Sequence, residues 1–172
     1  IGNTGDGKSS FANLYLKRNV FKVSDSPNGV TTQVRGESSK IDGITRYVID
    51  TEGLNDGEKI SAPQIQNLAK YMRLYKDGVN VIAIVLNGQA DRFSQGVKDI
   101  IKFTYNAFGS KEAMKHFCIV FTKCYSPRNP NRSTKQGEYM DKVKGYLSEI
   151  SGVKYENIPE VPVFFVDCYP EV

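Results

Sequence analysis

The run GNTGDGKS, from Gly2 to Ser9, has two glycines, a lysine and a serine at the spacing G-x-x-x-x-G-K-[ST]. Glycines here let the backbone turn tightly enough to direct several N–H groups at one anion. Lys8 adds a positive charge beside the β- and γ-phosphates of a nucleotide, and Ser9 offers a hydroxyl to Mg²⁺. The pattern therefore predicts a phosphate-binding loop. Its nucleotide-contacting residues are expected to be Asn3, Thr4, Gly5, Asp6, Gly7, Lys8, Ser9 and Ser10.

A second polar motif, D-T-E-G at residues 50–53, follows the loop by about 40 residues and ends a strand-like run. A carboxylate in this place is typical of a Mg²⁺ ligand that acts through water, and the glycine N–H can contact a γ-phosphate. We therefore expect Asp50 to bind the metal together with the loop serine, and Gly53 to take part in hydrolysis. A nucleotide switch also needs a loop threonine that reaches Mg²⁺ and the γ-phosphate. Thr31 is preferred for this metal and catalytic role, and Thr32 stays an alternative.

Helical and strand patterns alternate around these motifs. Expected helices cover residues 10–18, 63–76, 93–108 and 136–150, and expected strands cover 33–40, 44–49, 79–86, 116–122 and 161–166. Asp42-Gly43 predicts a hairpin turn between the first two strands. The alternation predicts an α/β fold of the P-loop NTPase type, with a mostly parallel central sheet, one antiparallel hairpin-paired strand, and helices on both faces. In such sheets ligands bind beyond the carboxyl ends of the strands.

Length and composition limit the class of protein. The 172 residues, 40% hydrophobic and 24% charged, predict one globular domain over residues 1–172, with its first strand and a C-terminal helix incomplete. The net charge of +4 comes from scattered Lys and Arg, so no nucleic-acid partner is expected. Cys118, Cys124 and Cys168 lack metal-ligand spacing and indicate reduced thiols in a cytoplasmic protein. The longest apolar run, 79–86, is too short to span a membrane, so membrane association is expected only through segments outside this chain.

The chain resembles the immunity-associated nucleotide-binding GTPases, the GIMAP/IAN family, and more distantly the Toc and septin-like GTPases. The resemblance rests on GNTGDGKSSFAN (2–13), VTTQV (30–34), DTEGL (50–54) and the segment 78–123. In that last segment, ADRFS and a strand ending in F-T-K follow the family's order and spacing. The resemblance implies a domain that binds GTP or GDP with Mg²⁺ and forms a homodimer or oligomer through its nucleotide face.

The resemblance also implies roles for single residues. Tyr125 stands where most GTPases carry the aspartate of [NT]-K-x-D, and the Toc proteins, which lack it too, use an acidic residue after the last strand. By this likeness Lys123 would cover the base with its stem, and Asp167 would accept hydrogen bonds from guanine N1 and N2. Arg92 would act across a dimer, either as a contact or as a finger that stabilises transition-state charge. His116 is expected to be structural.

Three functions stay open at this point. Leu54 follows Gly53 where Ras-like enzymes carry the glutamine that orients water, so intrinsic hydrolysis should be slow. The leading hypothesis is a GTPase whose self-association changes with nucleotide state. The alternatives are a nucleotide-binding scaffold with negligible turnover, and a P-loop ATPase or small-molecule kinase. Concentration-dependent hydrolysis separates the first two, and base preference separates the third.

Overall fold

The structure is a computed structural model of the whole chain. It describes residues 1–23, 34–51, 53, 63, 66–68, 70, 78–89, 93–108, 110–124 and 132–167. Several sequence predictions lie outside these residues, namely those for Thr31, Thr32, Leu54, Arg92, Tyr125 and Cys168 and for most of the helix expected at 63–76.

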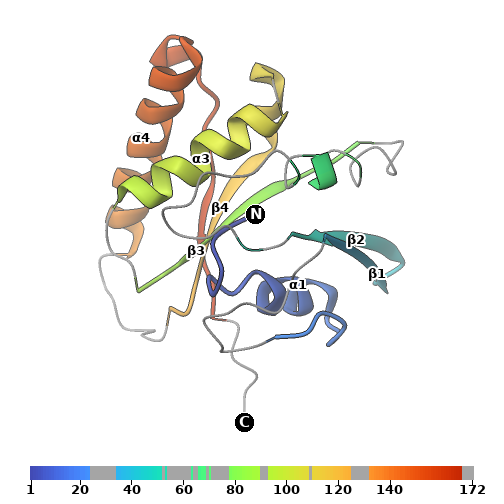
Figure 1. Cartoon of the computed structure of the whole chain (residues 1–172). Coiled ribbons are helices and arrows are strands. Elements are labelled where there is room, and N and C mark those ends of the chain that lie inside the picture. Colours follow the sequence, from blue (N-terminus) through green and yellow to red (C-terminus); the bar gives the residue numbers. More distant parts are fainter. Residues whose placement is uncertain are drawn as a thin grey trace.

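The strands form two sheets (Figure 1). β1 (Arg35–Ile41) and β2 (Ile44–Asp50) are antiparallel. β3 (Ile82–Asn87), β4 (Phe117–Thr122) and β5 (Val163–Phe165) are parallel and adjacent in that order. The expected α/β architecture is therefore confirmed, with each strand within three residues of its predicted start.

The hairpin turn at Asp42-Gly43 is also present, with positive φ angles of 52° and 78° at its two residues. The hairpin forms a two-stranded sheet of its own, which differs from the single mixed sheet expected. Ile1 lies beside β3, where the Val85 N–H donates to the Ile1 carbonyl at 2.8 Å and the Ile1 ammonium donates to the Ala83 carbonyl at 2.9 Å.

Helices lie on both sides of the parallel sheet (Figure 1). Their bounds are Lys8–Leu16 for α1, Gln95–Phe108 for α3 and Arg132–Ser151 for α4, with short 3₁₀ helices η1 at Lys111–His116 and η2 at Tyr155–Asn157. Ile84 of β3 points into the main core with α3 and α4, whereas its neighbour Val85 points to the other face, against Phe11 of α1. Alternate strand residues thus bury opposite faces, as both-sided cover requires.

Several predicted boundaries differ from the observed ones, by up to four residues at the start of α4, and the physical reason is visible at α1 and β4. α1 begins at Lys8 and ends at Leu16, not at residues 10 and 18, because Lys17 is left-handed at φ 50° and its N–H closes the last turn on the Leu14 carbonyl. β4 begins at Phe117 and not at His116, because η1 occupies the preceding residues. The exposed His116, the last residue of η1, has its Nδ1 2.9 Å from the carbonyl oxygen of Asn80, which precedes β3.

Candidate functional site

The phosphate loop follows Ile1, which lies beside β3, and leads into the start of α1. Gly5 and Gly7 have φ angles of 84° and 81°, in the left-handed region that side chains rarely adopt. The Asp6 carboxylate accepts from the Asn3 N–H at 3.1 Å, which holds the turn closed. The loop enters α1 at Lys8, so the positive end of the helix dipole points into the loop.

Lys8 is buried, with 9% of its surface exposed, and its Nζ donates to the Asn3 carbonyl at 2.8 Å. Burial lowers the pKa of this ammonium below the usual 10.5, whereas the negative charges of Asp50 and Asp6 act in the opposite direction. An ammonium that is this poorly solvated gains strongly from a nearby anion. The loop is therefore electrostatically suited to a phosphate group.

Ser9 and Asp50 join the two sequence motifs. The Ser9 hydroxyl donates to Asp50 Oδ2 at 2.6 Å, and Asp50, the last residue of β2, is 4% exposed. A hydroxyl and a carboxylate are hard oxygen ligands of the kind Mg²⁺ prefers. Among the described residues no group of three or more His, Cys, Asp or Glu could hold a metal. The donor set fits Mg²⁺ bound mainly through phosphate oxygens, since that ion commonly takes one or two carboxylates and substrate phosphates.

Gly53 lies directly against the phosphate loop. A Cβ placed on it would be 2.3 Å from Thr4 Oγ1 and 2.6 Å from Thr4 Cα. Real side chains do not approach this closely, so only glycine allows the D-T-E-G segment to touch the loop here. The nearby Thr51 hydroxyl is buried and has no hydrogen-bond partner in the structure described, which is a further polar atom available at this motif.

Thr122, the last residue of β4, ties the parallel sheet to the loop. Its Oγ1 donates to the Asp6 carbonyl at 2.6 Å, and its own carbonyl accepts from the Gly88 N–H at 2.7 Å. Thr122 is the threonine of the F-T-K strand end, for which the sequence predicted no role at the phosphate loop. Its signal was a hydroxyl at the end of an otherwise apolar strand, directly before Lys123.

The two residues expected at the base follow adjacent strands. Lys123 comes directly after β4, is half-buried and has a left-handed φ of 56°. Asp167 is exposed and lies two residues after β5. The Val166 N–H donates to the Phe121 carbonyl at 2.8 Å, which continues the β4–β5 pairing beyond the end of β5. Lys123 and Asp167 therefore leave the sheet at the same edge as Thr122 and the phosphate loop.

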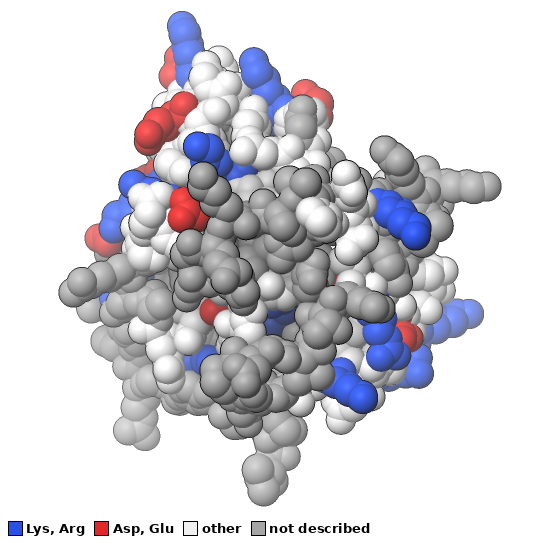
Figure 2. All heavy atoms as spheres, viewed as in Figure 1, with Lys and Arg blue, Asp and Glu red and all other residues white. Residues whose placement is uncertain are grey.

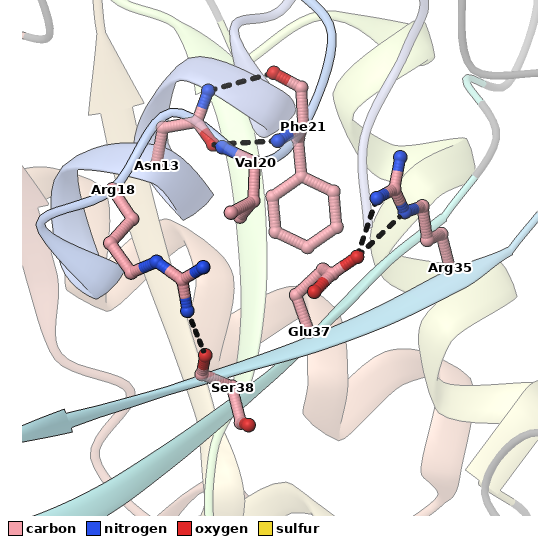
Figure 3. Close-up of polar contacts among 7 residues, drawn as sticks. All are labelled: Asn13, Arg18, Val20, Phe21, Arg35, Glu37 and Ser38. Carbon is pink, nitrogen blue, oxygen red and sulfur yellow. Dashed lines mark hydrogen bonds and ion pairs between the residues drawn. The ribbon is translucent and has the colours of Figure 1, made fainter.

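Asn13 forms a buried polar anchor behind the loop (Figure 3). Its Nδ2 donates to the Phe21 carbonyl at 2.9 Å, and its Oδ1 accepts from the N–H groups of Val20 and Phe21 at 3.0 and 2.9 Å. These bonds hold the chain that leads into the segment 24–33, where Thr31 is expected to act. In the sequence, the only sign of this role is an amide next to Ala12 and three residues before Leu16, two apolar residues that the structure buries.

The structure thus brings together most of the residues predicted for the site. The loop residues contact Asp50, Gly53 and Thr122, and Lys123 and Asp167 follow strands that end at this edge. Thr31 and Arg92 are outside the described residues, and their roles stay predictions.

A model of the AIG1 family matches residues 1–153. The chain belongs to the AIG1 family. Its relatives include immune-associated nucleotide-binding protein 9 of Arabidopsis thaliana, 29% identical over 89% of this chain and 44% of the relative. Protein 8 of the same series and plant is 32% identical over 71% of this chain and 34% of the relative. The chain therefore spans less than half the length of these relatives.

Solved structures agree on the fold of this AIG1 chain. Toc33 from Arabidopsis thaliana, crystallised as a dimerization-deficient mutant, has a TM-score of 0.77 and 20% identity, covering 98% of this chain and 69% of that chain. Toc33 from the same plant in complex with Mg²⁺ and GMPPNP has a TM-score of 0.73 and 20% identity at the same coverage. At this identity the likeness bears on the fold alone, and it confirms the expected P-loop NTPase fold.

Replacing Asn13 of the AIG1 domain with alanine should lower the free energy of unfolding by about 2–4 kcal/mol, because the buried Phe21 groups and the Val20 N–H lose their partner. Urea denaturation measures this change. Asn19→Ala, at an exposed position three residues after α1, is the matched control and should change it by less than about 0.5 kcal/mol. Equal effects of the two substitutions would contradict the anchoring role.

Proposed function

We propose that this AIG1 domain binds GTP and GDP with Mg²⁺, hydrolyses GTP slowly, and changes its self-association with the nucleotide. The observation that carries the proposal is the 2.6 Å hydrogen bond between Ser9 and Asp50. It joins the phosphate loop to the D-T-E-G motif, which is the pairing that a γ-phosphate switch requires.

Each part of the site has a role in this function. Lys8, the loop N–H groups and the start of α1 would hold the phosphates, and Ser9 and Asp50 would hold Mg²⁺, which neutralises phosphate charge when bound. Gly53 lies against the loop at Thr4, where a γ-phosphate would affect the D-T-E-G segment. Thr31 would complete the metal and phosphate contacts from the segment 24–33, which follows the residues that Asn13 holds, Val20 and Phe21.

Self-association is proposed because this domain needs a group that orients the attacking water. Leu54 replaces the glutamine that orients water in Ras-like enzymes, so a second copy could supply the missing group. Arg92 is the residue proposed to act across such a dimer. Similar solved structures support this proposal. For one of them, dimerization is stated to be important for the GTPase activity of the chloroplast translocon components atToc33 and psToc159.

Hydrolysis measured at rising protein concentration tests the proposal. If the domain is activated by dimerization, the turnover per molecule should rise with concentration and should fall in Arg92→Ala. A turnover that is independent of concentration and close to zero would favour the nucleotide-binding scaffold. The leucine at position 54, in place of a water-orienting glutamine, supports that alternative.

Base choice gives a separate prediction. Asp167→Asn should reduce the preference for GTP over ATP by roughly ten- to hundredfold. The carboxylate offers two charged acceptor oxygens to guanine N1 and N2, whereas the amide offers one neutral acceptor oxygen. Titration with fluorescent GTP, GDP and ATP in Mg²⁺ measures the preference. Glu160→Gln, at an exposed position just before β5, is the control and should leave it unchanged. An unaltered preference in Asp167→Asn would remove this residue from base recognition, and equal wild-type affinity for ATP would favour the ATPase.

A further inference from the structure

The net positive charge of the chain, +4, equals the excess of basic over acidic residues in one region, formed by the end of α1, the segment after it and the hairpin (residues 14–23 and 34–48). We call this region the basic hairpin surface. It contains Lys17, Arg18, Lys22, Arg35, Lys40 and Arg46, against Glu37 and Asp42. The chain has 23 basic and 19 acidic residues, so 17 of each sign remain elsewhere. Figure 2 shows several blue side chains close together at the lower right, over α1 and the hairpin, and further blue side chains interspersed with red ones over α3 and α4.

Several of these cations are held in place by contacts within the surface. The Arg46 guanidinium lies over the Tyr15 ring, 5.1 Å from its centroid, and Arg18 Nη1 donates to the Ser38 carbonyl at 3.0 Å. Arg35 pairs with Glu37 (Figure 3). Because these contacts link α1 to both strands, the charges are presented by a folded surface and not by loose side chains.

Exposed apolar side chains lie among the cations. Ile44 is 63% exposed, Tyr47 62% and Tyr15 45%. Since strand residues alternate between faces, Ile44 and Arg46 lie on the face of the hairpin that packs on α1, and Tyr47 and Lys40 lie on the opposite face. Each face near the turn therefore carries both an apolar side chain and a cation.

This distribution favours a lipid surface over a protein partner. A rigid protein contacts one face of a hairpin, whereas a layer of lipid headgroups surrounds both faces of its end. Tyrosine and isoleucine insert into the boundary of headgroups and acyl chains, and each nearby Lys or Arg is attracted to anionic lipid. The mixture of charge and apolar surface on both faces of the turn matches these requirements.

The turn of the hairpin is also far from the nucleotide site. β2 begins at Ile44 and ends at Asp50, which contacts Ser9, so about 20 Å of strand separates the turn from the site. α1 likewise begins in the phosphate loop and ends beside the hairpin. A membrane bound at the turn would leave the nucleotide face accessible, and Arg35, which lies opposite Asp50 at the other end of the hairpin, would be outside that contact.

We propose that the basic hairpin surface docks the domain peripherally on an anionic lipid membrane. No helix in the described part of the chain has the length and hydropathy needed to cross a bilayer. The proposal is independent of GTP hydrolysis. It adds a membrane contact within this domain to any that other segments provide.

Co-sedimentation with lipid vesicles tests the proposal. The chain should bind vesicles of phosphatidylcholine with phosphatidylserine, should not bind phosphatidylcholine alone, and should be released by salt. Lys17→Glu with Lys40→Glu should weaken binding at least about tenfold. Lys102→Glu with Lys154→Glu, at exposed positions outside the surface, changes the net charge equally and should have little effect. Equal loss in both double variants, or equal binding to phosphatidylcholine alone, would overturn the proposal.

A second variant tests the apolar part at constant charge. Ile44→Thr with Tyr47→Thr should weaken vesicle binding several-fold, because both exposed side chains lose their insertion into the lipid boundary. If this variant binds vesicles as well as the wild type does, and soluble polyglutamate displaces the protein from the vesicles, the surface instead fits an acidic protein partner. That result would overturn the membrane assignment. Circular dichroism and unchanged nucleotide affinity check that each variant is folded.

Discussion

Replacing Lys8 with methionine should weaken nucleotide binding by about thirtyfold or more, while the unliganded domain stays at least as stable as the wild type. The loss follows from removing a buried charge that pairs with phosphate, which costs about 2 kcal/mol or more. Stability should not fall, because relief from burying the ammonium, whose pKa burial lowers, offsets the lost hydrogen bond to the Asn3 carbonyl. Nucleotide titration and urea denaturation measure the two quantities. A variant that unfolds more readily and still binds normally would contradict this account of the loop.

The lowered pKa of Lys8 gives this variant a pH signature. Just below the usual pKa of 10.5, folded Lys8 binds fewer protons than the unfolded lysine does. The free energy of unfolding should therefore rise with pH between the lowered pKa and 10.5, and Lys8→Met should lack this contribution. The difference between the two pH profiles isolates Lys8 from other groups that titrate there. Bound phosphate should raise the pKa, so calorimetry at alkaline pH should detect proton uptake on nucleotide binding only in the wild type.

Gly53→Ala should abolish most GTP hydrolysis and lower the free energy of unfolding by about 1–3 kcal/mol. The added Cβ would meet Thr4 at 2.3 Å from Oγ1, 2.6 Å from Cα and 2.8 Å from the backbone N. Two of these atoms are backbone, so relief requires the D-T-E-G segment and the phosphate loop to separate. Affinity for a GTP analogue should fall more than affinity for GDP, because the γ-phosphate is the group expected to contact both segments.

Gly137→Ala is the matched control for this substitution. Gly137 lies in α4, a Cβ there would meet nothing within 4 Å, and alanine favours the helix. It should therefore raise the free energy of unfolding by about 0.5–1 kcal/mol and leave hydrolysis unchanged. Turnover that persists in Gly53→Ala would mean that contact between the two segments is not needed for hydrolysis.

Local sequence signals were sufficient for the elements and for the phosphate loop. The spacing of Gly2, Gly7, Lys8 and Ser9 is a property of eight consecutive residues, and the loop conformation follows from glycines in left-handed regions. The hairpin was predictable for the same reason, since Asp42-Gly43 meets the φ requirement of a two-residue turn. The boundary between η1 and β4 was not, because helix geometry after Ser110 competes with the apolar strand pattern that follows it.

What joins these local features was decided by tertiary structure. The contacts of Ser9 with Asp50, of Gly53 with Thr4 and of Thr122 with Asp6 connect residues that are 41 or more positions apart. No periodicity reports such pairs, because they depend on which strand ends meet at one edge.

The same holds for the roles of Asn13 and of the basic hairpin surface. In the sequence, Asn13 is one amide in a short helix and the lysines and arginines look scattered; folding buries the amide against Phe21 and gathers six of the cations on one region. The amino-acid sequence by itself therefore determined the fold class and the phosphate chemistry, which depend on neighbouring residues. Only the tertiary structure decided which distant groups share an environment, because hydrogen bonding and charge density depend on distance in space.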